Sequence, residues 1–161
     1  MIFITLGSQK FQFNRLLMSI DRLIETGNIE EEVFAQVGYS DYTPQNYKFK
    51  KFLDRQEFSD IMNQSDIVIT HGGTGAIIGA LKKKKKVIAV ARLSKYGEHV
   101  DDHQLQLIEQ FKDQNLICGL RECDEIGSAL NYVRNHEFNT YSSNTSRYID
   151  SIENFLNKEW Y

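Results

Sequence analysis

The chain has 161 residues and a mass of 18.7 kDa, a size that fits one domain. Hydrophobic residues make up 41% of the sequence and charged residues 25%, with one proline, which excludes disorder and predicts a single globular domain over residues 1–161. The formal net charge of −3 lacks the basic field typical of nucleic-acid-binding proteins, so no nucleic acid is expected as a partner.

The sequence shows no signal for export or for crossing a membrane. No apolar run approaches the roughly 20 residues that span a bilayer. The first apolar run has the length of a strand and lacks the basic region and cleavage site of a signal peptide. We therefore expect a cytoplasmic protein that meets the inner face of a membrane only peripherally, through a partner.

Short apolar runs alternate with amphipathic segments along the chain. In chain order, the pattern predicts a strand at 1–6, a helix at 11–24, strands at 32–37 and 47–53, a helix at 57–64, a strand at 66–70, a helix at 75–81, a strand at 87–90, a helix at 103–111, a strand at 116–118 and helices at 124–133 and 146–156. Such alternation predicts an α/β domain of Rossmann-like type, with a mostly parallel sheet covered on both faces.

A glycine-rich loop follows the fourth predicted strand and leads directly into an apolar helix. It reads His71-Gly72-Gly73-Thr74-Gly75. Glycines let the backbone approach a ligand, and the first N–H groups of a helix have no intrahelical partner, so the loop predicts a phosphate site. Thr74 is expected to add a hydroxyl donor or to act as the helix N-cap. The alternative is that the glycines serve the turn alone; Walker A and GxGxxG spacings are both absent.

A second polar cluster follows the next predicted strand. Two histidines, three carboxylates and an amide occupy positions 98–104. Carboxylates bind pairs of hydroxyls, and imidazole and amide groups both donate and accept, so the cluster suits a carbohydrate. Two alternatives are a helix start capped by Asp101 or Asp102 and, less well matched by the spacing, a metal site.

Together the His71–Gly75 loop, the helix and strand after it, and the segment 98–104 resemble the C-terminal domain of family 28 glycosyltransferases. The resemblance covers nearly the whole chain. Within this group the sequence is most similar to small single-domain members, typified by the eukaryotic Alg13 subunit and by bacterial capsule and exopolysaccharide transferases. It implies the nucleotide-sugar (donor) binding half of a GT-B glycosyltransferase.

The resemblance also implies a UDP-sugar ligand and a set of site residues. These are His71, Gly72, Gly73, Thr74, Gly75, Gly7 and Ser8 for the diphosphate, Glu98, Asp102, His103 and Gln104 for the sugar and ribose, and Phe52 and Leu53 beside the uracil. No catalytic residue is assigned. The family works without a bound metal, so neither a metal nor another cofactor is expected.

The sequence departs from the family pattern at three positions. Many members have a ribose-binding glutamate where this chain has Gly79, and a glycine and a proline where it has Lys84 and Lys86. We therefore expect ribose recognition to pass to Glu98 or Asp102, or to be weaker than in the relatives.

The resulting hypothesis is the donor-binding subunit of an inverting UDP-sugar hexosyltransferase in bacterial surface polysaccharide biosynthesis, with galactose slightly favoured. Two-domain members carry acceptor binding on an N-terminal domain that this chain lacks. The expected partners are therefore a membrane-associated acceptor-binding subunit and a lipid-linked saccharide acceptor. The alternative is a non-catalytic module that binds a nucleotide sugar or stimulates a partner enzyme.

Two further features have two interpretations each. The five lysines at 82–86 are expected to be a solvated helix end or a contact for anionic lipid headgroups. Aromatic residues near the C-terminus are expected either to pack on the domain or to dock a partner; they are Tyr141, Tyr148, Phe155, Trp160 and Tyr161.

Overall fold

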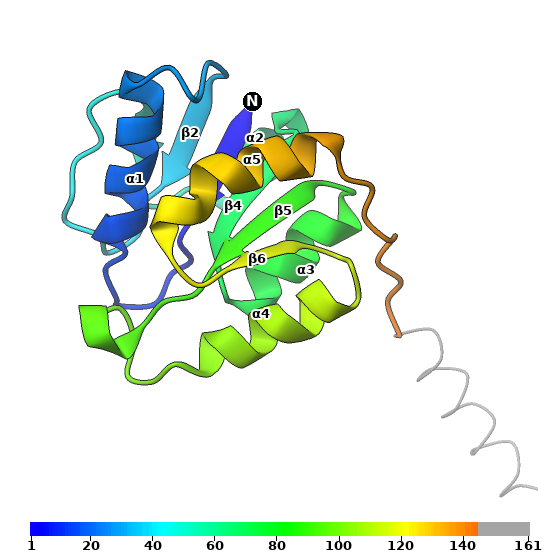
Figure 1. Cartoon of the computed structure of the whole chain (residues 1–161). Coiled ribbons are helices and arrows are strands. Elements are labelled where there is room, and N and C mark those ends of the chain that lie inside the picture. The colour runs from blue at the N-terminus through cyan, green and yellow to red at the C-terminus, as the bar shows by residue number, and fades with distance from the viewer. Residues whose placement is uncertain (145–161) are drawn as a thin grey trace, which may run out of the picture.

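Six short strands form one parallel sheet in the computed structural model, which describes residues 1–144. The strands are β1 (Ile2–Thr5), β2 (Val33–Gln36), β3 (Lys48–Lys50), β4 (Ile67–His71), β5 (Lys86–Val90) and β6 (Cys118–Leu120). Their order across the sheet is β3-β2-β1-β4-β5-β6, and each neighbouring pair is parallel (Figure 1). This confirms the predicted Rossmann-like α/β class and makes the sheet wholly parallel.

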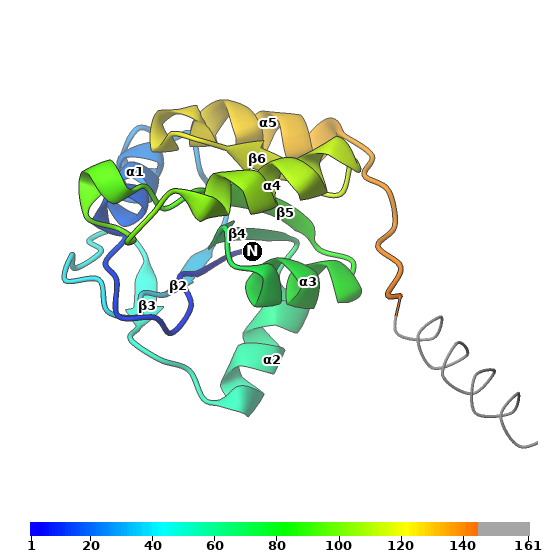
Figure 2. The ribbon, with the colours of Figure 1, turned by 90° about the horizontal axis from the view of Figure 1, so that it is seen from below.

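Helices cover both faces of the sheet. They are α1 (Asn14–Glu25), α2 (Arg55–Gln64), α3 (Thr74–Lys82), α4 (His103–Asp113) and α5 (Ile126–Asn135), with short 3-10 helices at Ser94–Tyr96 and Cys123–Glu125. One face packs on α1 and α5, the other on α2, α3 and α4 (Figure 2). Ile4 of β1 joins the first core cluster and its neighbour Phe3 the second, since successive strand residues point to opposite faces.

The carboxyl ends of β1, β2 and β4 lie together at one edge of the sheet. Thr5 of β1 pairs with Gln36 of β2 on one side and with Thr70 of β4 on the other. The strand order reverses between β1 and β4, and ligands of open α/β sheets bind in the crevice at such a switch point. The loops that leave β1 and β4 therefore flank the expected crevice.

Element boundaries differ from the sequence prediction in places with identifiable causes. The strand predicted at 47–53 is only Lys48–Lys50, an exposed edge strand. The helix predicted at 57–64 begins two residues earlier, because Asp54 and Glu57 form a reciprocal capping box at its start. The helix predicted at 146–156 lies outside the described residues. None of the helices within residues 1–144 is both long and apolar enough to cross a membrane.

The lysine run has a structural use that neither sequence interpretation anticipated. Lys85 Nζ donates to the carbonyls of Asn63 and Ser65, at 2.9 and 2.7 Å, just where α2 ends. Lys86 Nζ donates to the carbonyls of Val133 and Arg134 in α5, at 2.6 and 3.1 Å. Because the last carbonyls of a helix lack intrahelical partners, these ammonium groups neutralise two helix ends.

The family's frequent glycine at position 84 also has a physical explanation. Lys84 adopts a left-handed backbone conformation with φ 57. This conformation costs a non-glycine residue roughly 1–2 kcal/mol, partly offset by the roughly 0.5–1 kcal/mol that glycine loses through its freedom in the unfolded chain.

Lys84→Gly should therefore raise the free energy of unfolding by about 0.5–1 kcal/mol, measured by urea denaturation. The matched control is Lys82→Gly in the last turn of α3, which should lower it by about 1 kcal/mol. Equal destabilisation by both substitutions would mean that the Lys84 side chain makes a stabilising contact that outweighs the backbone strain.

Candidate functional site

The loops that leave β1 and β4 meet around the imidazole of His71. A Cβ atom on Gly7 would lie 2.8 Å from the ring carbon Cε1, and one on Gly73 would lie 2.4 Å from Nε2. Gly7 also has a positive φ of 73°. Only glycine lets both backbones approach the ring this closely. Two stretches that are 66 positions apart in the sequence thus lie against one ring.

His71 is a buried, neutral histidine. Its side chain is 8% exposed, and burial lowers its pKa to about 4, with the charge of Arg92 acting in the same direction. The hydroxyl of Thr70 donates to the Thr5 carbonyl at 2.8 Å, so its oxygen faces His71 Nδ1, at 3.3 Å, as an acceptor. We infer that the ring proton is on Nδ1, which leaves Nε2 as an acceptor.

Two sets of backbone N–H groups without partners flank this ring. In the β1–α1 loop, the N–H groups of residues 7–10 make no hydrogen bond to any part of the chain that the structure describes. In the other loop, α3 begins at Thr74, so the N–H groups of residues 74–76 have no intrahelical acceptor. Free N–H groups at a helix start and in a glycine loop are suited to bind an anion.

The structure decides between the two predicted uses of Thr74. The N-cap of α3 is Gly73, and Thr74 is the first helical residue, with no capping hydrogen bond from a side chain. The N-cap interpretation of Thr74 is therefore wrong, because the helix begins one residue earlier than that role requires. Thr74 is exposed, as are Gly75 and Ser8, so the hydroxyl-donor prediction remains a prediction.

Gln104 holds the glycine loop in place. It is buried, and its Oε1 accepts from the backbone N–H of Gly72 at 3.0 Å and from that of Arg92 at 3.1 Å. A Cβ atom on Gly72 would lie 2.6 Å from Gln104 Cβ, which explains the second glycine. The amide oxygen of Gln104 is thus engaged in joining the ends of β4 and β5.

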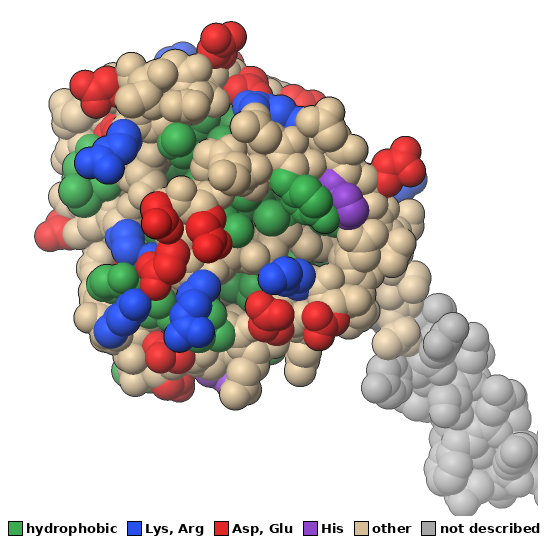
Figure 3. Space-filling model, viewed as in Figure 1, with side chains coloured by type: hydrophobic (Ala, Val, Ile, Leu, Met, Phe, Trp, Pro, Cys, Tyr) green, Lys and Arg blue, Asp and Glu red, His purple; other side chains and the backbone are tan. Residues whose placement is uncertain are grey.

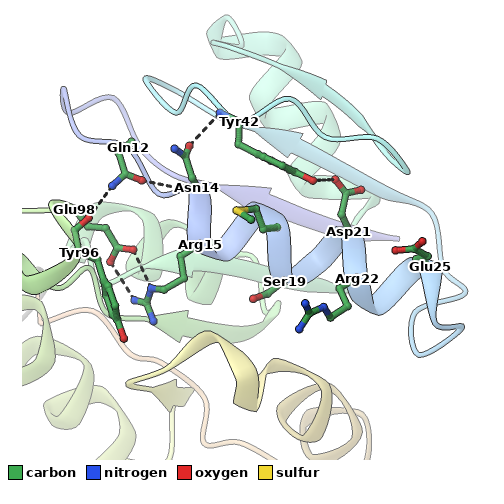
Figure 4. A pocket seen from close by; sticks show the side chains of 11 residues that line it. Gln12, Asn14, Arg15, Ser19, Asp21, Arg22, Glu25, Tyr42, Tyr96 and Glu98 are labelled. Atoms are coloured by element: carbon green, nitrogen blue, oxygen red, sulfur yellow. Dashed lines mark hydrogen bonds and ion pairs between the residues drawn. The ribbon is translucent and has the colours of Figure 1, made fainter.

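Glu98 does not fit its predicted contact with sugar or ribose. Its side chain is fully buried, and its two oxygens accept from Arg15 Nε at 2.9 Å and Arg15 Nη2 at 3.0 Å (Figure 4). The second oxygen also accepts from the Leu93 N–H at 3.0 Å. The expectation is corrected on this ground: the carboxylate faces an arginine of α1, and sequence spacing gave no sign of that distant partner.

Asp102 and His103 are exposed at the start of α4. Asp102 occupies the N-cap position, yet its Oδ1 accepts from Ser94, from N–H at 2.8 Å and from the hydroxyl at 3.0 Å, which lowers the pKa of the carboxyl. The N–H of His103 is instead bound by Asp101 Oδ1, at 2.9 Å. Asp102 therefore occupies the predicted N-cap position, but its side chain does not bind the helix. The carboxylate of Asp101, one residue earlier, binds the first helical N–H instead.

Of the two residues expected beside uracil, Phe52 borders a hollow past the ends of β2 and β3. The ring of Phe52 is 41% exposed and meets Tyr39 edge to face, with centroids 5.2 Å apart. Both rings line a hollow of about 390 Å³. The Leu53 N–H donates to Gln36 Oε1 at 2.9 Å, so this backbone group already has a partner.

A groove of about 690 Å³ runs along α1, away from the glycine loops (Figure 4). Among the predicted site residues only Glu98 lines it. Arg15 is balanced there by Glu98 and by Glu122, whose other oxygen pairs with Lys95, and Figure 3 shows basic and acidic side chains intermixed on this side of the molecule. The charges of these four groups therefore cancel in pairs. Within residues 1–144, no group of three or more His, Cys, Asp or Glu is arranged to hold a metal.

Arg92 is the site residue that the sequence analysis missed. It follows β5 directly, is 1% exposed and extends beneath the β1–α1 loop, where it donates to the carbonyls of Leu6 and Phe11, at 2.6 and 2.8 Å. Burial lowers its pKa to about 10, so it is still a cation at pH 7. The available signal was a lone arginine directly after the apolar run 87–91, beside the strand that carries the glycine loop.

Solved structures with this architecture are glycosyltransferases of GT-B type. The glycotransferase of kitacinnamycin matches with a TM-score of 0.62 and 14% identity, over 84% of this chain and 35% of that chain. MurG of Acinetobacter baumannii matches with a TM-score of 0.55 and 15% identity, over 83% of this chain and 41% of that chain. The fold is therefore that of one Rossmann-like domain of a GT-B glycosyltransferase.

Residues 1–126 match the glycosyltransferase family 28 C-terminal domain, and the chain belongs to this family. It is 30% identical to the UDP-N-acetylglucosamine transferase subunit ALG13 of Kluyveromyces lactis over 97 residues, which are 57% of this chain and 47% of the relative. The protein of the same name from Candida albicans is 28% identical over 96 residues, 58% of this chain and 28% of the relative. The chain thus matches less than half the length of either relative.

Acidification should destabilise the fold through His71. Its pKa is about 4 when folded against an ordinary 6.5, so between these values the unfolded chain binds a proton that the folded chain does not. Stability should therefore rise with pH across this window, by about 2–3 kcal/mol from this residue. In urea titrations from pH 4 to 6.5, His71→Asn should flatten the slope, whereas the exposed control His103→Asn should keep it. A slope unchanged in His71→Asn would contradict a buried neutral imidazole.

Proposed function

We propose that this chain is the donor-binding subunit of a UDP-sugar hexosyltransferase. The observation that carries the proposal is the pair of loops with unpartnered N–H groups, at residues 7–10 and 74–76, on either side of His71 at the switch point of the sheet. A nucleoside diphosphate carries the negative charge that such groups bind. The hollow beside Phe52 lies past the end of β2, the strand next to β1, and its aromatic rings suit the base of the same nucleotide.

The same groups suit the chemistry of transfer. When a sugar leaves UDP, negative charge builds up on the departing diphosphate. Preoriented N–H donors and the positive end of α3 stabilise that charge without rearranging, which lowers the barrier to transfer. We propose that they serve in place of a metal ion, and that the reaction inverts the anomeric centre as the family resemblance implies.

The donor sugar is proposed from the relatives. Both curated relatives are named as subunits of a UDP-N-acetylglucosamine transferase, which favours UDP-N-acetylglucosamine as the first donor to test. Galactose and a role in capsule or exopolysaccharide synthesis, which the sequence analysis favoured, gain no support from these relatives. Their designation as subunits supports a partner, and a membrane-associated partner with a lipid-linked acceptor at the inner membrane face stays part of the proposal.

The first measurement is calorimetric titration of the purified chain with UDP, UDP-N-acetylglucosamine, UDP-galactose, UDP-glucuronic acid and GDP-mannose, without metal and then with Mg²⁺. We expect metal-independent binding of uridine ligands, with UDP-N-acetylglucosamine the tightest sugar nucleotide. A preference for GDP-mannose would contradict the proposed donor. Binding that requires Mg²⁺ would contradict the metal-free site.

Gly75 offers a sharper test, because the fold itself does not need a glycine there. A Cβ atom on Gly75 would meet nothing within 4 Å, so Gly75→Ala should keep or slightly raise stability. If a diphosphate lies against the start of α3, the added methyl should weaken UDP binding by about tenfold, the effect of roughly 1.4 kcal/mol. The control is Lys82→Ala, an exposed position at the other end of α3, which should bind UDP as the wild type does.

Transfer is expected to need the partner. The purified chain should bind donor but transfer little labelled sugar from UDP-N-acetylglucosamine, whereas addition of membranes from the source cells should restore transfer to a lipid-extractable product. In that assay Gly75→Ala should lower transfer as it lowers UDP affinity. Full transfer with Gly75→Ala would instead favour the alternative, a partner-stimulating module whose own site is not used.

A further inference from the structure

Arg92 connects two elements that are not neighbours in the sheet. It follows β5, yet its guanidinium reaches past β4 to the loop that leaves β1. There Nη2 donates to the carbonyl of Leu6 at 2.6 Å, and Nη1 donates to the carbonyls of Phe11 at 2.8 Å and Gln12 at 3.4 Å. The two ends of the stretch 7–10 are thus tied to one buried side chain.

The charge of Arg92 is poorly compensated within the described chain. Its strong hydrogen bonds go to neutral carbonyls, and Nε has no hydrogen-bond partner within residues 1–144. Glu98, whose charge acts on Arg92, is bound through both oxygens by a different arginine, Arg15. A partly compensated buried cation is costly to keep, so an anion held at the neighbouring loops would offset part of that cost.

The contacts of Arg92 also orient the start of the loop. With the carbonyl of Leu6 turned toward the guanidinium, the N–H of Gly7 in the same planar peptide unit points away from it, and the N–H groups of residues 7–10 have no partner within residues 1–144. The guanidinium binds the carbonyl directly before Gly7, and the backbone N–H of Arg92 shares Gln104 Oε1 with that of Gly72, so Arg92 lies beside both glycine loops. One side chain therefore both shapes the N–H groups and supplies positive potential behind them.

We propose that Arg92 is a positioning residue for the donor diphosphate: it holds the β1–α1 loop by its carbonyls and provides a buried positive charge, without itself touching the donor. This inference rests on the proposed function and adds a residue to the same site. It assigns the effect of Arg92 to the diphosphate and not to the nucleoside.

The experiment compares UDP with uridine, measured by NMR shift titration on Arg92→Met, Arg92→Lys and the wild type. Arg92→Met should weaken UDP binding about tenfold to a hundredfold and uridine binding less than about threefold, since uridine carries no phosphate. The UDP affinity of Arg92→Lys should lie between those of Arg92→Met and the wild type, because lysine keeps the charge but cannot bridge both carbonyls. The control is Arg134→Met, an arginine of α5 paired with Glu31, which should lower the melting temperature without separating the two ligands.

The outcomes separate a positioning role of Arg92 from a purely structural one. Equal loss of UDP and uridine in the Arg92 variants, or the same selective loss in Arg134→Met, would overturn the positioning role and leave Arg92 a purely structural residue. If Arg92→Met does not fold, the affinities for UDP and uridine are compared in Arg92→Lys instead. Failure of the wild type to bind either ligand would overturn the proposed function together with this inference, whereas wild-type binding of UDP with unselective variants would overturn this inference alone.

Discussion

The close approach of two loops to one imidazole ring is the constraint on which the site depends. Gly7 and Gly73 both contact His71 at distances that no Cβ atom permits, and the ring is neutral because it is buried. The parallel sheet makes this meeting possible, since β1 and β4 are adjacent and end at the same edge. The N–H groups without partners follow from that geometry, and the capacity to bind an anion follows from those N–H groups.

Around His71, buried polar side chains hold the loops in position. Gln104 binds the backbone of Gly72 and Arg92 with one oxygen, Arg92 binds the carbonyls of the β1–α1 loop, and Glu98 is paired with Arg15 of α1. In the cluster where the sequence indicated sugar-binding groups, the structure thus uses two of the four for support. Positioned backbone donors and buried supporting side chains are what a rigid diphosphate site requires.

The fold was predictable because its signals are local. Alternating apolar runs and amphipathic segments predicted the class, and the composition of the His71–Gly75 segment predicted the turn from β4 into α3. Boundaries failed where a single contact decides them, as with the capping box that starts α2 at Arg55, or where a strand is exposed, as with β3. The prediction for Glu98 failed for a different reason, because its partner Arg15 lies 83 positions away in the sequence.

The sequence by itself determined the mostly parallel α/β class, the family and the glycine-rich turn from β4 into α3, because these depend on periodicity and on residue types within a few positions of each other. Only the tertiary structure decided which polar groups face the crevice and which support it. Burial and distant partners make that choice: Arg92 and Glu98 read as ordinary charged residues in the chain, and become a buried cation and a paired carboxylate only when β1, β5 and α1 are packed together.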